Sequence, residues 1–223
     1  MSLEVLASEE WAGRVGRSLS AVIAAQPGIR LCLATGATTA PMYRKTSILG
    51  DPVIFLLDEF GGLSPDDPAR CAAMLARDLP GFAFLAPEVD SEEPEIAAER
   101  YGTAIAKDGV DLAVVGLGTN GHIGMNEPGS ARDSKTRVVQ LAESTRAGAL
   151  AYGAEHEPEW GITVGLSELL ECKEVWVVVT GSHKAHILAR VMSSVVGPEL
   201  PATYIREHPM VRFLADTDAA RLL

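Results

Sequence analysis

Cysteine is scarce in this sequence, and positive charge is concentrated nowhere along it. The three cysteines, Cys32, Cys71 and Cys172, are far apart and odd in number, and no CxxC pair occurs. A disulfide framework and a zinc knuckle both need paired, suitably spaced cysteines, so we predict neither. No run of lysine or arginine stands out, and the net charge is -11. Nucleic acids and anionic membranes are bound through basic surfaces, so we expect neither as a partner.

Long apolar segments are missing as well. No apolar run reaches the roughly 18 residues that a membrane-spanning helix needs. The segment from Met1 to Ala12 lacks the basic start and the apolar stretch of a signal peptide. We therefore expect a soluble, cytoplasmic protein. An anionic small molecule is a compatible ligand, provided that a local positive pocket overcomes the negative field of the whole chain.

What the sequence does contain is a series of short apolar runs separated by helical segments. Apolar residues at helical spacing over Ser8–Ala25 predict an amphipathic helix with Ser8 as its cap. Further helices are expected from about Pro41 and over about 183–195. Predicted strands are 31–34, 53–57, 112–115 and 175–179, with late candidates at Tyr204-Ile205 and 211–214. Such strands form a mainly parallel sheet with helices on both faces, so we predict one Rossmann-like α/β domain over residues 1–223.

Polar and glycine-rich residues follow each predicted strand. They are Thr35-Gly36, Asp58, Gly116 to His122, and Gly181-Ser182. The carboxyl ends of parallel strands meet at one edge of a sheet, and ligands bind there in open α/β folds. We therefore expect these loops to converge on a single site.

A dinucleotide site is the first alternative to consider, because Gly116, Gly118 and Gly121 match G-x-G-x-x-G. That pattern needs a helix that opens at the third glycine and presents its N-terminus to pyrophosphate. The residues that follow, His122 to Gly129, are too rich in glycine and proline to form it. No acidic ligand for a ribose is evident after the next strand. A nicotinamide cofactor is therefore disfavoured.

Two segments point to a phosphate site. The loop Thr35-Gly36-Ala37-Thr38 offers backbone N–H groups and hydroxyls to an anion, although a plain strand-to-helix turn explains it equally well. Lys184 lies in the first turn of the predicted helix after Gly181. A lysine there opposes the helix dipole, so helix stability does not account for it, whereas a bound phosphate does.

Asp58, His122 and Glu127 are candidates for proton transfer. Asp58 closes an apolar strand, where partial burial tunes the pKa of a carboxylate, although a solvated loop acid is the common alternative. His122 and Glu127 form a His–carboxylate pair of the kind that moves protons near a substrate. His183 and His186 are suitably spaced on a helix, but no carboxylate or cysteine joins them, so we take neither as a metal ligand.

Four segments together resemble the glucosamine-6-phosphate deaminases and their galactosamine-6-phosphate relatives, over most of the chain. In the order of that family they are 31–38 (LCLATGAT), 57–63 (LDEFGGL), 112–129 (LAVVGLGTNGHIGMNEPG) and 161–184 (GITVGLSELLECKEVWVVVTGSHK). The resemblance implies a domain of the sugar-phosphate isomerase type. The related 6-phosphogluconolactonases typically carry Asp-Glu-Arg and Gly-His-Thr, where this chain has Asp58-Glu59-Phe60 and Gly121-His122-Ile123. The first and last segments lean toward the galactosamine-6-phosphate branch.

The resemblance implies a reaction that turns an amino-hexose 6-phosphate and water into a ketohexose 6-phosphate and ammonia, with no metal or organic cofactor. His122, oriented by Glu127, assists the opening of the pyranose ring. Asp58 moves the C2 proton to C1, and water then attacks C2. The residues that the resemblance places against the substrate and its phosphate are Thr35, Gly36, Ala37, Thr38, Gly116 and Lys184.

The chain departs from this family at several positions. Many deaminases have an aspartate where Asn120 stands; asparagine still hydrogen-bonds an imidazole but cannot stabilise imidazolium by charge, so we interpret Asn120 as a tuned catalytic residue. The family's phosphate-binding arginine aligns near Ala151, and either Arg146 or Lys184 with the loop takes its place. Allosteric hexameric members have a longer C-terminal segment and a lysine at the position of Val139, so we expect no effector control of that kind.

Three functions are open at this point. They are the deaminase, a lactone hydrolase with His122 as general base toward water, and a non-catalytic sugar-phosphate sensor. Asn120 and the missing arginine are the only support for the sensor. We expect a small-molecule sugar phosphate as partner and a monomer or small homo-oligomer, with the gluco or galacto configuration of the sugar undecided.

Overall fold

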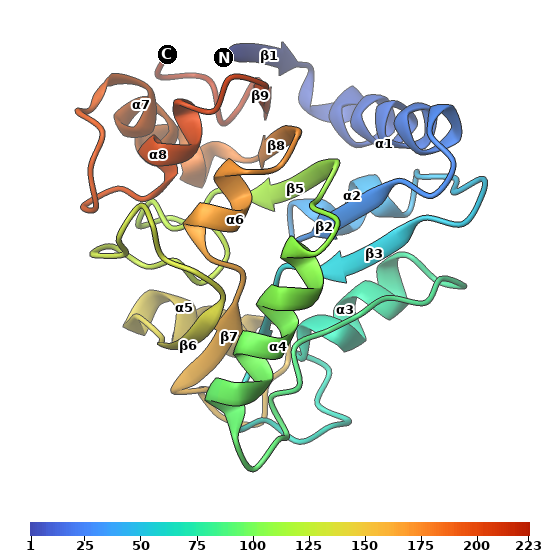
Figure 1. Ribbon diagram of the computed structural model, residues 1–223. Helices are drawn as coiled ribbons and strands as arrows, with labels where there is room; N and C mark the ends of the chain where they lie inside the picture. The colour runs from blue at the N-terminus through green and yellow to red at the C-terminus, as the bar shows by residue number, and fades with distance from the viewer.

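The computed structural model describes residues 1–223 and contains a larger parallel sheet and a smaller antiparallel one (Figure 1). The larger sheet has six strands in the order β1-β9-β8-β5-β2-β3, and every pairing in it is parallel. Its strands are β1 (Ser2–Leu6), β2 (Arg30–Leu33), β3 (Val53–Leu56), β5 (Leu112–Gly116), β8 (Glu174–Val179) and β9 (Val211–Asp216). The predicted α/β fold with a mainly parallel sheet is confirmed.

Helices cover both faces of the larger sheet and bury an apolar core on each. One face carries α1 (Ser8–Ala25), α2 (Thr39–Tyr43) and α3 (Cys71–Asp78), and the other carries α4 (Pro94–Ala106), α6 (Leu166–Leu170), α7 (Ala185–Ser193) and α8 (Ala202–Arg206). Within β8, Trp176 and Val178 pack into the first core, while Val175 and Val177 pack into the second. A strand buried on both faces is apolar at every position, which is why these strands read as continuous apolar runs.

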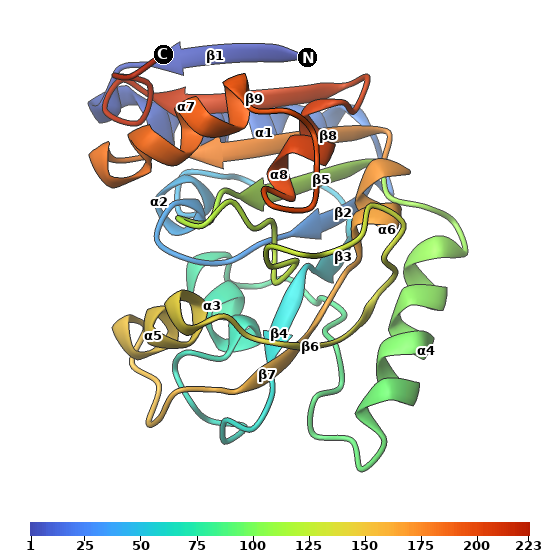
Figure 2. The same cartoon turned by 90° about the vertical axis from the view of Figure 1, so that its left-hand side faces the viewer.

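The smaller sheet holds three strands in the order β4-β7-β6. They are β4 (Asp58–Phe60), β7 (Trp160–Thr163) and β6 (Arg137–Gln140), and β6 leads into α5 (Glu143–Ala151). Figure 2 shows this sheet below the stacked strands of the larger one. The sequence pattern did not predict it, and it changes the place of Asp58. That residue does not close β3, which ends at Leu56, but opens β4 opposite Thr163.

The position of the site follows from the point in the larger sheet where the direction of strand addition reverses. From β2 the chain continues to β3 on one side, whereas β5, β8 and β9 follow one another on the other side. β2 and β5 are neighbours, paired from Leu31 with Leu112 to Leu33 with Val114. Loops that leave two such strands run in opposite directions and open a crevice between them, which is the usual ligand site of an open α/β sheet.

Several predicted helix ends differ in detail. The helix Ser8–Ala25 is confirmed, but Ser8 is its first residue, and its hydroxyl bonds Thr217 and Asp218 at 3.0 Å rather than capping the helix. α2 begins at Thr39, ahead of Pro41. The helix predicted over 183–195 is a 3₁₀ turn, Ser182–Lys184, followed by α7.

The strand predicted at Tyr204-Ile205 is wrong, because these residues lie in α8. Pro201 precedes that helix, and the hydroxyl of Thr203 bonds the carbonyl of Leu200 at 2.6 Å. Ile205 is fully buried in the core beneath α7 and α8. Packing of one apolar face has outweighed the β preference of a short Thr-Tyr-Ile run.

The first strand, β1, was not predicted either. It forms the edge of the larger sheet beside β9, at the top of both views (Figures 1 and 2). Because the two strands are parallel, the N-terminus lies at one end of β1 and the C-terminus lies toward the other end, as Figure 2 shows. Leu3 and Val5 are partly exposed, as an edge strand allows, so no continuous apolar run marked it. No helix in the structure combines the length and the apolar character needed to cross a membrane.

Candidate active site

A cavity of about 340 Å³ opens at the carboxyl ends of β2 and β5. This volume lies within the range of small-molecule sites. Eight of the residues singled out in the sequence line it: Thr35, Gly36, Ala37, Thr38, Asp58, Gly116, His122 and Lys184. Two others, Asn120 and Glu127, do not line it: Glu127 contacts the His122 imidazole, and Asn120 contacts Glu127 and the backbone of His122. Gly181 and Ser182, which were expected at the site, do not line the cavity; the next two residues, His183 and Lys184, do.

The loop after β2 forms one end of the cavity. Gly36 has a φ of 125°, a conformation that only glycine adopts without strain. Its carbonyl accepts the hydroxyl of Thr39 at 3.2 Å, which closes the turn into α2. Thr38 reaches across to Thr180 after β8, with 3.2 Å between their hydroxyl oxygens. The loops after two strands of the sheet are thus joined at this end of the cavity.

Lys184 lies in the 3₁₀ turn that precedes α7 and is half-buried. Its Nζ donates a hydrogen bond to the carbonyl oxygen of Leu117 at 2.7 Å, which joins it to the glycine-rich loop after β5. Burial lowers the pKa of the ammonium group, because desolvation disfavours the charged form. An anion in the cavity opposes that effect, so the lysine is a natural counter-ion for one.

His122 and Glu127 form a hydrogen-bonded pair within the loop after β5. The Nδ1 of His122 lies 3.2 Å from a carboxylate oxygen of Glu127, and Thr145 of α5 donates to the other oxygen. Asn120 donates to Glu127 at 2.8 Å. Burial opposes ionisation of Glu127, but the hydrogen bonds from His122, Thr145 and Asn120 outweigh it and lower the pKa of this carboxyl. Glu127 is therefore held as a carboxylate that orients the imidazole and leaves Nε2 for the cavity.

Asn120 does not hydrogen-bond the imidazole, contrary to what the sequence predicted. Its carbonyl oxygen accepts the backbone N–H of His122 at 3.1 Å, and its amide donates to Glu127. The side chain therefore touches the carboxylate and the backbone rather than the imidazole. An amide provides both a donor and an acceptor, so it holds the loop and Glu127 at the same time.

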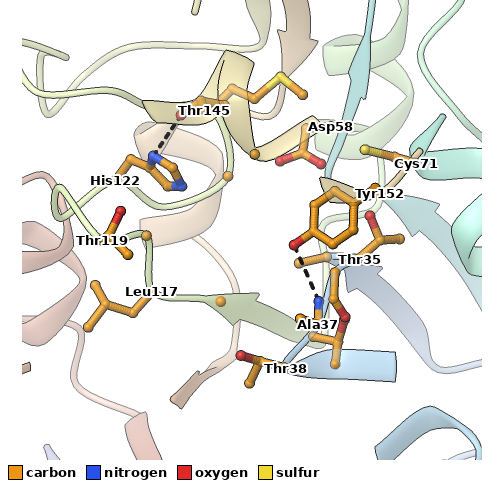
Figure 3. Close-up of a pocket in the computed structure, with 18 of the residues that line it drawn as sticks. Thr35, Ala37, Thr38, Asp58, Cys71, Leu117, Thr119, His122, Thr145 and Tyr152 are labelled. Atoms are coloured by element: carbon orange, nitrogen blue, oxygen red, sulfur yellow. Dashed lines mark hydrogen bonds between the residues drawn. The ribbon is translucent and has the colours of Figure 1, made fainter. Parts of the chain in front are cut away.

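Asp58 lies at the first position of β4 with 8% of its surface exposed. Figure 3 shows its carboxyl and the His122 imidazole pointing into the same space from opposite walls. Burial raises the pKa of Asp58 to about 7; a hydrogen bond from Cys71 lowers it in part, and the charge of Glu59 raises it further. A carboxyl with such a pKa exchanges a proton readily near neutral pH.

Glu59 fixes the backbone on which Asp58 is carried. It is completely buried, and its carboxylate accepts the backbone N–H groups of Phe60, Cys71 and Ala72 at 2.8–2.9 Å. Two of these N–H groups belong to the first turn of α3, which otherwise has no side-chain cap. Arg70 lies 3.6 Å away. Glu59 thereby joins β4 to the N-terminus of α3, where a negative charge is favourable.

The glycines of the loop after β5 allow the loop to pack closely around His122. A Cβ on Gly118 would lie 2.2 Å from the His122 ring, so only glycine allows the ring to occupy its place. Gly121 has a φ of 93°, and no helix follows it before α5. The G-x-G-x-x-G match thus reflects how this loop packs around His122.

Other lining residues were missed in the sequence. Among them are Phe60, Cys71, Ser144, Thr145, Tyr152, Thr180 and His183. Thr145 and Tyr152 belong to α5 and the residue after it, a helix that no clear apolar period announced. His183 lines the cavity, and the structure contains no group of three or more His, Cys, Asp or Glu side chains placed to hold a metal ion. Arg146 pairs with Glu157 at 3.3 Å and does not line the cavity.

Replacing Glu59 with glutamine is expected to destabilise the fold. Glutamine has one acceptor oxygen where three backbone N–H groups need two, so a buried donor loses its partner. We expect Glu59→Gln to lower the free energy of unfolding by about 2–4 kcal/mol. Urea denaturation followed by circular dichroism measures this change. Glu99→Gln, at an exposed position of α4, is the matched control and should leave the midpoint unchanged.

Asp58 is expected to cost stability at neutral pH. In the folded protein its pKa is about 7, against 3.8 for an ordinary aspartate, so the folded state binds more protons between these values. The free energy of unfolding therefore falls as the pH rises from about 4 to about 7, and the full cost is present above that. Asp58→Asn should raise it by about 1–4 kcal/mol above pH 7 and leave it unchanged below pH 4. The same measurement on Asp66→Asn, an exposed position, should show no such gain.

Comparisons with known proteins identify the relatives of this chain. Residues 4–213 match the family model described as glucosamine-6-phosphate isomerases/6-phosphogluconolactonase. A glucosamine-6-phosphate deaminase of Rhodopirellula baltica is 34% identical, and the match covers 100% of this chain and 96% of that protein. A glucosamine-6-phosphate deaminase of an Exiguobacterium species is 37% identical over 85% of this chain and 79% of its own length.

Solved structures give the same picture. A monomeric glucosamine-6-phosphate deaminase superimposes with a TM-score of 0.92 at 28% identity, and the match covers the whole of both chains. The 6-phosphogluconolactonase of Trypanosoma brucei superimposes with a TM-score of 0.77 at 19% identity, over 100% of this chain and 98% of that one, and so shares the fold. The family match extends over nearly all of the sequence, and the chain therefore belongs to the glucosamine-6-phosphate isomerase/6-phosphogluconolactonase family.

Proposed function

We propose that this chain is a glucosamine-6-phosphate deaminase that converts its substrate and water into a ketohexose 6-phosphate and ammonia. One observation carries the proposal: a buried carboxyl with a pKa of about 7, Asp58, faces the His122–Glu127 pair across a cavity that ends in an anion-binding loop. Isomerisation of an aldose needs a base for the C2 proton and a second group for the ring oxygen. The names of the similar deaminases from two bacteria support the same substrate.

The first step is opening of the pyranose ring. The C1 hydroxyl loses its proton, the bond from C1 to the ring oxygen breaks, and the ring oxygen gains a proton to become the C5 hydroxyl. His122 exchanges these protons through Nε2, because its Nδ1 is occupied by Glu127 and Thr145. The Glu127 carboxylate stabilises the imidazolium formed on the way.

Asp58 then moves a proton between neighbouring carbons. Its carboxylate takes the proton from C2, which the substrate's own ammonium group makes more acidic. A proton of the ammonium group passes to the C1 oxygen, and an enolamine forms. The carboxyl returns the proton to C1, which leaves an iminium at C2. Because the pKa of Asp58 is about 7, the group is strong enough to take the proton and weak enough to give it back.

Hydrolysis completes the reaction. Water adds to the iminium carbon C2, and its oxygen gives up both protons to the nitrogen as the carbon–nitrogen bond breaks. C2 becomes a carbonyl, and the nitrogen leaves as ammonia together with one proton. The product is a ketohexose 6-phosphate. The proton transfers and the addition of water are covered by Asp58, His122 and the substrate itself, so the proposed reaction uses neither a metal nor an organic cofactor.

The phosphate anchors the sugar at the far end of the cavity. Thr35, Gly36, Ala37 and Thr38 present N–H groups and hydroxyls there, and Lys184 supplies the positive charge. A Cβ on Gly116 would meet no atom within 4 Å, so the floor between the two ends is open for the carbon chain. Figure 3 shows the loop residues on one side of this space and His122 on the other.

We further propose that the chain works as a cytoplasmic monomer or small homo-oligomer, with all its residues in one catalytic domain. The full-length similarity to a deaminase described as monomeric supports this assembly. The negative net charge of -11 is compatible with a freely diffusing protein and a small anionic substrate bound at a local positive group.

The decisive experiment is an ammonia-release assay on glucosamine 6-phosphate. The wild-type protein should release ammonia and ketohexose 6-phosphate in equal amounts, and Asp58→Asn should lower kcat by about a thousandfold or more, because the variant lacks the carboxylate that takes the C2 proton. The dependence of kcat/KM on pH should show an acidic limb near pH 7, where Asp58 loses its proton. Unchanged ammonia release by Asp58→Asn contradicts the mechanism.

Two further substrates complete that assay. Galactosamine 6-phosphate, the C4 epimer, tests the second branch of the family that the sequence resembles. Hydrolysis of 6-phosphogluconolactone tests the lactone hydrolase, since His122 faces the cavity as a general base would and Glu127 contacts its imidazole. Lactone hydrolysis without ammonia release reverses the assignment, and tight binding of sugar phosphates without any turnover supports a sensor.

Gly118 offers a test of the His122 position. A Cβ there overlaps the imidazole, so Gly118→Ala should displace the ring and lower kcat/KM by about a hundredfold or more. The fold should persist, as judged by an unchanged circular dichroism spectrum. Gly197→Ala is the matched control, because a Cβ at that position meets no atom within 4 Å and lies outside the cavity. Full activity of Gly118→Ala would show that the ring position is not needed.

A further inference from the structure

The phosphate end of the cavity contains little positive charge. Among its 24 lining residues there is one lysine, Lys184, and no arginine. Lys184 already donates one hydrogen bond to Leu117, and burial lowers its pKa. A phosphate monoester has three terminal oxygens and carries up to two negative charges. The chain that binds it is itself negative, with a net charge of -11. Donors other than cations must therefore contribute to its binding.

Tyr152 brings such a donor to the loop. It is the residue after α5, its ring lines the cavity, and about a third of it is exposed (36%). The hydroxyl oxygen accepts the backbone N–H of Ala37 at 3.4 Å, as Figure 3 shows. The same oxygen lies 3.0 Å from the point where a Cβ on Gly36 would be. An oxygen atom thus already occupies the space above the backbone of the anion-binding loop.

The bond from Ala37 to this hydroxyl is long for a hydrogen bond between N–H and oxygen. An anionic phosphate oxygen is a much better acceptor than a phenol. The Ala37 N–H therefore gains by turning to the phosphate, and the phenolic O–H, which has a proton of its own to donate, becomes free to bind another phosphate oxygen.

We propose that Tyr152 is a direct ligand of the substrate phosphate, donating its phenolic hydrogen to a terminal oxygen beside Ala37 and Lys184. The position of Arg146 agrees with this assignment, because that side chain pairs with Glu157 and does not line the cavity. Binding thus uses the cation of Lys184, the donors of the loop, and the phenol of Tyr152 as a further neutral donor. The inference rests on the proposed function for the identity of the substrate, but phosphate binding itself can be measured without turnover.

The test compares Tyr152→Phe with wild type in two assays. Inorganic phosphate is titrated as a ligand by isothermal calorimetry, and KM and kcat are measured for glucosamine 6-phosphate. A hydrogen bond from a neutral donor to a charged group accounts for about a tenfold change in affinity, so the Kd of phosphate and the KM should both rise about tenfold. The value of kcat should stay within about twofold, because the phosphate is bound alike in the ground and transition states.

Tyr204→Phe is the matched control. Tyr204 is a half-buried tyrosine of α8 outside the cavity, so its hydroxyl should affect neither constant. An unchanged or tighter phosphate affinity in Tyr152→Phe overturns the proposal, since the phenol would then only cover the loop.

The two proposals fail separately. If wild type binds phosphate in a Tyr152-dependent manner but releases no ammonia, the phosphate ligand stands and the deaminase assignment falls. If ammonia is released and Tyr152→Phe changes neither Kd nor KM, the deaminase stands and the role of Tyr152 falls.

Discussion

The pairing of β2 with β5 is the constraint on which the site depends. These strands are adjacent in the sheet but far apart in the sequence, from Leu31 opposite Leu112 to Leu33 opposite Val114. Their loops leave in opposite directions and carry Thr35 to Thr38 on one side of the cavity and His122 on the other. A register shift by one residue would turn every side chain of a strand to the other face. Each face packs into its own apolar core, so such a shift would disrupt the packing of both cores. Core packing therefore holds the two loops of the site in position.

Two buried carboxyl groups lower the stability of the fold unless their charges are satisfied. Asp58 and Glu59 are adjacent carboxyls in a buried segment, and they differ in how they are satisfied. Burial raises the pKa of both carboxyls and is the largest cause in each. At Glu59, three backbone N–H groups and the nearby Arg70 offset part of that effect, whereas Asp58 has fewer partners and its pKa reaches about 7. Ionising Asp58 therefore costs stability at neutral pH. A buried group with a strongly shifted pKa inside a cavity is typical of an active site.

The smaller sheet and α5 complete the site from outside the parallel sheet. β4 carries Asp58, and α5 brings Thr145 to Glu127 and Tyr152 to Ala37. The two contacts of α5 lie at opposite ends of the cavity (Figure 3). α5 and the residue that follows it thereby touch both the His122–Glu127 pair and the loop after β2. The parallel sheet alone supplies neither contact.

The sequence by itself determined the parallel sheet, its helices on both faces, and the candidate residues at the strand ends. Buried strands must be apolar on both faces, and sharp loops need glycine, so both leave a local pattern. The same local reasoning failed at Tyr204-Ile205, where packing against α7 prevailed, and at Ser8, whose hydroxyl found partners near the C-terminus.

Three features were decided only by the tertiary structure. Asp58 begins a strand of the smaller sheet, Gly118 has no room for a side chain, and Tyr152 lies over the loop after β2. The partners of these residues, among them Thr163, the His122 ring and Tyr152, are brought to them by chain folding. The raised pKa of Asp58 has the same origin, because burial is a property of the whole packed chain. Sequence patterns record which groups need special surroundings, and long-range contacts decide what those surroundings are.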